Sequence, residues 1–112
     1  MMRETVIQEL QESARVKTLI AERLADTIVE AARIITRTYR EGGKVLLIGN
    51  GGSAADAQHI AAELVGRFKL ERPALPALAL ATNNPLLTAV ANDYGYDSVF
   101  SRELTALASH GD

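Results

Sequence analysis

The chain has 112 residues, of which 47% are hydrophobic and 23% charged, a balance typical of at most one ordinary globular domain. Its net charge of −2 comes with no basic stripe, so we expect neither nucleic acid nor a membrane surface as a partner. Without cysteine there are no disulfides or thiolate ligands, and without a long apolar run for a membrane span we expect a cytoplasmic protein.

Two amphipathic helices are predicted at the start of the chain. Apolar residues recur at helical spacing over residues 4–21 and again over 25–41, and Gly42-Gly43 supplies a C-terminal stop. Such helices need a surface to cover, and in a chain this short a partner subunit could supply it. We therefore expect residues 1–42 to be a helical segment used for oligomerisation.

A strand, a turn and a helix follow. The run KVLLI, residues 44–48, lies between glycines and is typical of a buried parallel strand. Residues 49–52 turn the chain, and Ser53 is predicted to begin a helix that runs to about Phe68. Asp56, three residues after Ser53, would complete a pair like a capping box.

The same alternation continues to the end of the chain. A second apolar strand is predicted at residues 77–81, a helix from Pro85 to about Val90, a loop at 92–96 and a last helix at 98–108. Strands that alternate with helices predict an α/β fold with a parallel sheet. Because two strands make a poor sheet, we expect residues 43–112 to be the N-terminal half of a larger domain, and the chain to be an N-terminal portion.

The stretch GNGGS, residues 49–53, has two open interpretations. A glycine turn between a strand and a helix presents free backbone N–H groups at the positive end of the helix dipole, which suits a phosphate or sugar phosphate. Asn50 and Ser53 add polar side chains, and the turn lies where ligands bind in open α/β sheets. The alternative is a plain turn whose glycines serve only the conformation of the chain.

A dinucleotide site is the less favoured interpretation of the same turn. Gly49-x-Gly51-x-x-Ala54 fits the G-x-G-x-x-A fingerprint that follows a strand. That fingerprint also requires an acidic residue at the end of the second strand, where this chain has Ala81-Thr82-Asn83 instead. We therefore do not expect a dinucleotide.

His59 and Glu63 lie four residues apart and so on one face of the predicted helix. Imidazole and carboxylate are both ligands that suit Zn²⁺, although a zinc site needs a third and usually a fourth ligand. The alternative is a solvated polar face, which Asp56 and Arg67 would extend. Glu63 has a further possible role as a general base that moves a proton between two sugar carbons.

Asn92-Asp93 follows the helix after the second strand, near the same edge of the sheet. These side chains could hydrogen-bond sugar hydroxyls, or they could simply cap and turn the chain.

Three segments together resemble a known family. GGKVLLIGNGGSAADAQHIAAELVGRF, RPALPALAL and AVANDYGYDSVFSREL are similar to the phosphoheptose isomerase branch of the sugar isomerase (SIS) domain family. The combination of GNGGSAAD, QH-x₃-E and NDYGY is specific, whereas none of the three motifs is specific alone. The resemblance implies a doubly wound α/β SIS domain with flavodoxin-like layers, preceded by helices that pack in a homotetramer.

The resemblance also implies a reaction and the residues that carry it. Sedoheptulose 7-phosphate would be converted to glycero-manno-heptose 7-phosphate, an early step toward lipopolysaccharide heptose, through an enediol. Glu63 would be catalytic, and His59 and Glu63 would bind zinc, the implied cofactor. The implied substrate contacts are Asn50, Gly51, Gly52, Ser53, Glu63, Asn92 and Asp93.

One departure limits what the resemblance implies, and two other functions stand beside the isomerase. The family carries a serine-rich phosphate loop, a glutamine and a second metal-binding histidine further along, so these 112 residues are expected to lack a complete site. A non-enzymatic relative with a very similar GNGGSAA segment binds the replication initiator, and this is the alternative function. A sugar-phosphate-sensing SIS domain inside a regulator is a third hypothesis, disfavoured by the absence of a DNA-binding segment before the SIS-like region.

Overall fold

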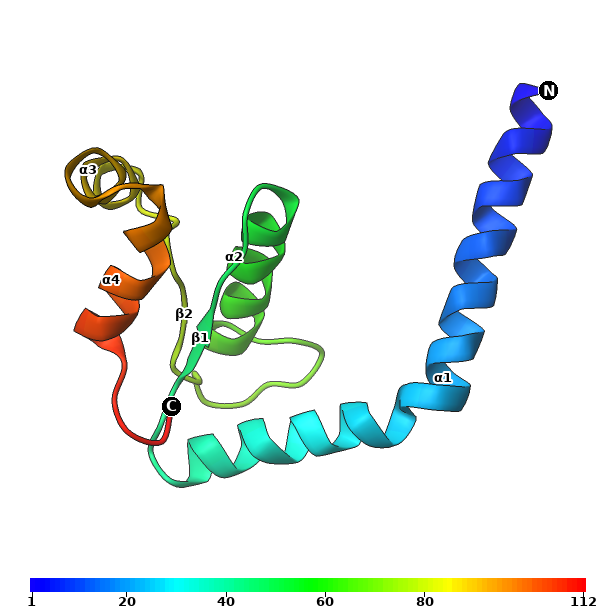
Figure 1. Cartoon of the computed structure of the whole chain (residues 1–112). Helices are drawn as coiled ribbons and strands as arrows, with labels where there is room; N and C mark the ends of the chain where they lie inside the picture. The colour runs from blue at the N-terminus through cyan, green and yellow to red at the C-terminus, as the bar shows by residue number, and fades with distance from the viewer. The chain divides into compact units, whose positions relative to one another are not determined.

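The computed structural model describes all 112 residues, which divide into two compact units, Met1–Ile35 and Thr36–Asp112. The elements follow one another in the order α1, β1, α2, β2, α3, η1 and α4 (Figure 1). None of the helices combines the length and the apolar character needed to cross a bilayer.

Helix α1 is continuous from Met2 to Arg40. The prediction of two helices is wrong, because residues 22–24, Glu-Arg-Leu, are good helix formers and contain no Gly or Pro to end the first one. The helix ends before Gly42, which adopts a φ of 82°. No residue of α1 is buried, and many large apolar side chains are exposed: Val6, Leu10, Val16, Ile20, Leu24, Ile28, Val29, Ile34 and Ile35.

The sheet consists of two parallel strands, β1 (Val45–Leu47) and β2 (Ala77–Ala79). Both strands are shorter than the sequence predicts. The ladder continues for one more bond, from the N–H of Leu80 to the carbonyl of Leu47 at 2.8 Å. The predicted parallel pairing is therefore confirmed, over a shorter length.

The end of β2 is fixed by a buried acidic side chain. Ala81 has a φ of 55°, so the chain leaves the extended conformation there. Its N–H donates to Oε2 of Glu103 at 2.7 Å, and Glu103 is buried. The carboxylate thus satisfies a backbone donor that the sheet no longer pairs.

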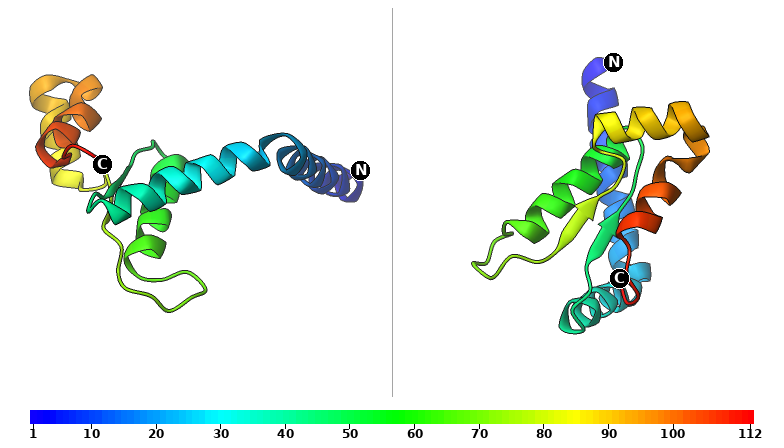
Figure 2. Two further views of the ribbon diagram at one scale, coloured as in Figure 1. Left: turned by 90° about the horizontal axis from the view of Figure 1, so that it is seen from below. Right: turned by 90° about the vertical axis from the view of Figure 1, so that its left-hand side faces the viewer.

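Helices cover both sides of the strands. Helix α2 (Gly52–Val65) lies on one side, and α3 (Asn84–Tyr94) and α4 (Val99–Leu107) lie on the other (Figures 1 and 2). A short 3₁₀ helix, η1 (Tyr96–Ser98), joins α3 to α4. This is the doubly wound α/β arrangement that the sequence predicts, with a small apolar core formed by Ala57, Ala61, Leu80, Val90 and Val99.

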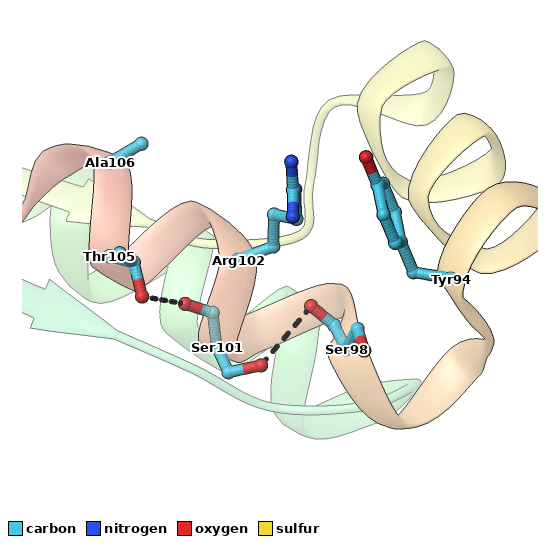
Figure 3. A pocket seen from close by; sticks show the side chains of 6 residues that line it. All are labelled: Tyr94, Ser98, Ser101, Arg102, Thr105 and Ala106. Carbon is cyan, nitrogen blue, oxygen red and sulfur yellow. Dashed lines mark hydrogen bonds between the residues drawn. The ribbon is translucent and has the colours of Figure 1, made fainter.

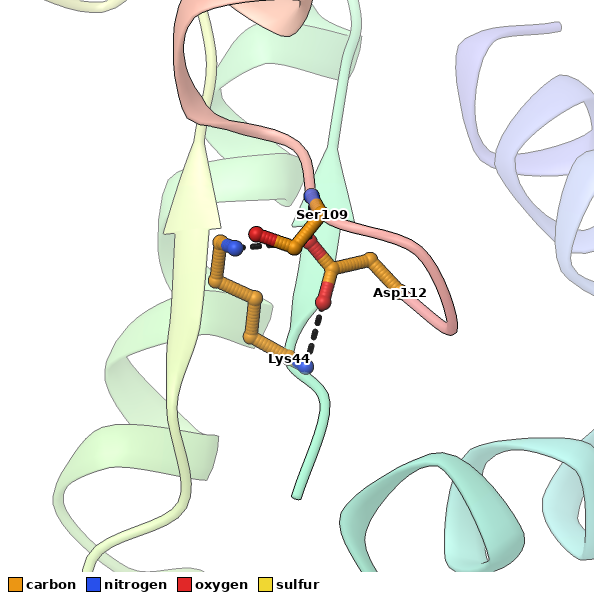
Figure 4. Close-up of polar contacts among 3 residues, drawn as sticks. All are labelled: Lys44, Ser109 and Asp112. Atoms are coloured by element: carbon orange, nitrogen blue, oxygen red, sulfur yellow. Dashed lines mark hydrogen bonds and ion pairs between the residues drawn. The ribbon is translucent and has the colours of Figure 1, made fainter. Parts of the chain in front are cut away.

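An ion pair joins the segment after α4 to the start of β1 (Figure 4). Asp112 accepts the N–H of Lys44 at 3.0 Å and pairs with its Nζ at 2.6 Å, and it also accepts the N–H of Ser109 at 2.8 Å. The Asp112 side chain is only 8% exposed. The hydrogen bond from Lys44, followed by the one from Ser109, lowers the pKa of Asp112 from 3.8 to about 2.

This pKa gives the fold a specific sensitivity to acid. Because the folded-state pKa lies below the unfolded one, the stabilisation by Asp112 is complete above about pH 4 and is lost as the pH falls toward 2. Urea unfolding of Asp112→Asn should show lower stability at pH 7 and a smaller further loss between pH 4 and 2 than the parent. Asp97→Asn, at an exposed aspartate of η1, is the control. Equal acid sensitivity in the parent and Asp112→Asn would contradict this assignment.

Candidate functional site

The turn after β1 leaves the N-terminus of α2 open. Gly51 is the N-cap, with a φ of 56°, and no side chain caps the helix. The prediction that Ser53 caps it is wrong: the helix begins at Gly52, so Ser53 lies inside the first turn, where its N–H donates to the carbonyl of Asn50 at 3.0 Å. Backbone N–H groups at an uncapped helix start are available to an oxygen-rich ligand.

The two central glycines of the turn border open space. A Cβ added to Gly51 or Gly52 would meet no atom within 4 Å, whereas one added to Gly49 would meet the backbone of Ser53 at 2.5 Å. Position 51 requires glycine because its φ is positive, and position 49 requires glycine because a Cβ there would clash with the backbone. Gly52 has neither reason, so the fold leaves room for a ligand at this position.

Asn50 is held by a residue distant in sequence. The hydroxyl of Tyr96, at the start of η1, donates to Oδ1 of Asn50 at 2.9 Å. This bond connects the GNGGS turn to the NDYGY segment, two of the motifs quoted above. The sequence gives no local signal for it, because 46 residues separate the two partners.

His59 and Glu63 meet as their spacing predicts. Nε2 of His59 lies 3.2 Å from Oε1 of Glu63, with the two side chains 76% and 35% exposed. Gly52, Asp56, His59 and Glu63 recur at intervals of three and four, so they share a face of α2 that differs from the one buried at Ala57 and Ala61. A largely apolar hollow of about 380 Å³ adjoins the pair, lined by His59, Ile60, Glu63, Leu64, Phe68 and Arg72.

Arg72 holds the C-terminal end of α2, and sequence reasoning did not find it. Its guanidinium donates to the carbonyls of Glu63 at 2.6 Å, Leu64 at 2.8 Å and Gly66 at 3.1 Å. These are carbonyls that the helix itself leaves unpaired, at the end where its dipole favours a cation. Arg72 therefore fixes the backbone that carries Glu63.

The His59–Glu63 pair fits part of a zinc site. Two ligands of one tetrahedral zinc, at bond lengths near 2.0–2.2 Å, stand about 3.3 Å apart. The Nε2–Oε1 separation of 3.2 Å is close to this value. The chain nevertheless contains no group of three His, Asp or Glu side chains that could hold a metal ion. The remaining ligands of such a site would have to come from outside these residues.

Asn92 and Asp93 lie in the last turn of α3 and not in a loop as predicted. Asn83 begins this helix by accepting the N–H of Leu86 at 3.2 Å, and Gly95, with a φ of 94°, ends it. The side chains of Asn92 and Asp93 are exposed and bond to each other at 3.1 Å. No hydrogen bond joins them to the His59–Glu63 pair or to the glycine turn, so the predicted residues form separate groups.

A second hollow lies between α3 and α4 and involves none of the predicted site residues (Figure 3). It measures about 480 Å³ and is lined by Tyr94, Ser98, Ser101, Arg102, Thr105 and Ala106. The Arg102 guanidinium lies 4.0 Å from the centroid of the Tyr94 ring. The hydroxyls of Ser101 and Thr105 donate to backbone carbonyls of their own helix region, at 3.4 and 2.8 Å, so their protons are already engaged.

The sequence of the chain matches a known domain family. The family model of the SIS domain matches residues 10–112, and the chain therefore belongs to the SIS domain family. Figure 1 shows the part of this domain in which the strand edge, the glycine turn and helix α2 come together.

Relatives and solved structures narrow the likeness to one branch. The chain is 56% identical to the phosphoheptose isomerase of Aquifex aeolicus (strain VF5) and 55% identical to that of Roseiflexus sp. (strain RS-1), over 99% and 96% of its length. It superposes on the phosphoheptose isomerase of Neisseria gonorrhoeae with a TM-score of 0.91 at 43% identity, over 100% of its length. For the Francisella tularensis structure the TM-score is 0.89 at 36% identity, over 96% of the chain. The resemblance seen in the motifs is thus confirmed.

The chain covers only part of the length of each relative. The chain spans 58% of the Aquifex protein, 54% of the Roseiflexus protein, 58% of the Neisseria chain and 56% of the Francisella chain.

Proposed function

We propose that the protein, in its full natural length, is an isomerase that converts sedoheptulose 7-phosphate to D-glycero-D-manno-heptose 7-phosphate. The observation that carries the proposal is one helix, α2, which begins at an open glycine turn and bears His59 and Glu63 on the same face as Gly52. The names of the similar proteins support the same reaction. None of the relatives described above supports the alternative of a replication-initiator-binding protein.

The spacing along α2 suits a phosphorylated sugar. At 1.5 Å per residue, Glu63 lies about 16 Å along the helix from Gly52. Side chains on a helix tilt toward its N-terminus, so the carboxylate of Glu63 reaches back toward the turn. The distance between the turn and the carboxylate, which an extended seven-carbon sugar phosphate would span, is therefore shorter than the distance between the two backbone positions. Asn50, Gly51, Gly52 and Ser53 would contact its oxygens at one end, and Asn92 and Asp93 would bond further hydroxyls.

The proposed chemistry is a proton transfer between neighbouring carbons. The carboxylate of Glu63 removes a proton from C1 of the ketose, which gives an enediolate with its charge on O2. The hydroxyl proton of O1 passes to O2, and the protonated Glu63 returns the first proton to C2, which gives the aldose. Oε1 of Glu63 lies 3.2 Å from Nε2 of His59, so Oε2 is the oxygen left for the substrate. The pair is open to solvent, so the reaction needs a further segment or a second subunit to exclude water from the site.

Zinc is the cofactor we propose, with His59 and Glu63 as two of its ligands. When bound, zinc would supply Lewis-acid polarisation of the sugar's carbonyl and hydroxyl oxygens. Elemental analysis of the full-length protein should find zinc, and His59→Ala should lower its content. A metal content that is unchanged in this variant would exclude His59 as a ligand.

We also propose that α1 packs against copies of itself in a homotetramer. The support is its row of exposed apolar side chains, together with the absence of any buried residue in this helix. Light scattering of the full-length protein tests the assembly, and a monomeric mass would contradict it.

We place the reaction in the cytoplasm, in the synthesis of lipopolysaccharide heptose.

The isomerase itself is tested by a direct conversion assay. The full-length protein should convert sedoheptulose 7-phosphate to the aldose heptose 7-phosphate, as resolved by chromatography and NMR of the products. Fructose 6-phosphate, a shorter ketose phosphate, is the control substrate and should react more slowly. If sedoheptulose 7-phosphate is recovered unchanged from zinc-loaded protein, the proposed function is wrong.

A further inference from the structure

Tyr96 and Asn50 form a contact that the proposed reaction does not itself explain. The Tyr96 hydroxyl reaches the carboxamide of Asn50, at the edge of the sheet where β1 ends, and donates to Oδ1 at 2.9 Å. Both residues are exposed, and Tyr96 is 57% exposed. A neutral hydrogen bond in such a place adds little to the stability of the fold, because water competes for both groups.

The bond does, however, engage one of the two polar groups of Asn50. A carboxamide has one acceptor oxygen and one NH₂ group with two donors, and rotation by half a turn exchanges them. A phenolic hydroxyl can donate or accept, and in this structure it donates to Oδ1 of Asn50. With Oδ1 engaged, Nδ2 is the group of Asn50 that remains for a ligand at this turn, whose Gly51 and Gly52 border open space.

We propose that Tyr96 is a positioning residue that fixes Asn50 as a hydrogen-bond donor toward an oxygen of a sugar phosphate. The inference rests on the proposed function for the choice of ligand. It goes beyond that function by assigning Asn50 a direction, donor and not acceptor, and by making the NDYGY segment part of the glycine-turn site.

The chain offers a matched control for the hydroxyl. Tyr94 belongs to the same NDYGY segment and is also 57% exposed, but its ring lies against Arg102 and not against Asn50. Tyr94→Phe therefore removes a hydroxyl from the same segment while it keeps the aromatic ring over the guanidinium. Tyr96→Phe removes the hydroxyl that bonds Asn50.

The test is a double-mutant cycle on binding of sedoheptulose 7-phosphate to the full-length protein, measured by calorimetry. Tyr96→Phe should raise Kd about 2- to 10-fold, the range for one neutral hydrogen bond, and Tyr94→Phe should leave it unchanged. In an Asn50→Ala background, Tyr96→Phe should cause no further increase, because it acts through Asn50. The melting temperature of Tyr96→Phe should stay that of the parent.

A second readout needs no ligand. In ¹⁵N NMR spectra, the side-chain NH₂ signals of Asn50 should move in Tyr96→Phe and stay in place in Tyr94→Phe. Unmoved signals, or equal effects of Tyr96→Phe with and without Asn50, would overturn the inference. If the cycle shows coupling but no conversion occurs, the positioning role stands and the isomerase proposal fails. If the sugar phosphate does not bind the parent protein, both fail.

Discussion

Glu63→Gln should lower kcat for sedoheptulose 7-phosphate by about 10²- to 10⁴-fold, the usual contribution of a general base. The amide has the shape of the carboxylate and can still accept the hydrogen bond from His59, but it cannot take a proton from carbon. The side chain is 35% exposed and its hydrogen-bond partner is His59, so the free energy of unfolding should change little. The measurement combines steady-state kinetics with thermal unfolding of the same preparation.

Glu71→Gln is the matched control for this substitution. Glu71 follows α2 and pairs with Arg67 at 3.1 Å through the same four-residue spacing, with an exposed side chain. An exposed pair of this kind contributes little, so both kcat and stability should stay near those of the parent. If Glu63→Gln keeps the parental kcat, or if Glu71→Gln loses as much, Glu63 is not the base.

Much of the α/β unit could be predicted because its signals are local. The apolar runs at 44–48 and 77–81 and the glycines between strand and helix predict parallel strands with a connecting helix, as found. The errors concern the ends of helices, where a single residue determines the boundary. Gly51, and not Ser53, is the N-cap of α2, and α3 ends only at Gly95, so Asn92 and Asp93 lie inside it. Helix α1 was predicted as two helices because its apolar residues form two separate periodic patterns, although no helix-breaking residue lies between them.

The candidate site could be predicted only as far as its contacts are local. The His59–Glu63 contact follows from helical spacing alone. The bond between Tyr96 and Asn50 spans 46 residues, and the bond from Arg72 to the carbonyl of Glu63 depends on how the loop after α2 folds back. Such contacts depend on the tertiary fold, and no sequence pattern around Tyr96 or Arg72 predicts them.

Gly52→Ala should make the fold slightly more stable and the site weaker. Gly52 is the first residue of α2, without a positive φ, and an added Cβ would meet no atom within 4 Å. Alanine in such a position usually raises the free energy of unfolding by about 0.4–1 kcal/mol, because it restricts the unfolded chain. The methyl group would occupy the space beside the open helix N-terminus. Crowding of about 1–3 kcal/mol there weakens sugar-phosphate binding by roughly 5- to 150-fold.

Gly49→Ala separates this effect from a general intolerance of the turn. A Cβ at Gly49 would lie 2.5 Å from the backbone of Ser53, so this variant should be destabilised. Chemical unfolding and calorimetric titration with sedoheptulose 7-phosphate distinguish the two glycines, since stability and affinity change in opposite directions only for Gly52. Unimpaired binding by a stable Gly52→Ala protein would show that the ligand does not approach the turn. Lower stability of that variant would instead mean that Gly52, like Gly49, is glycine for the sake of the fold.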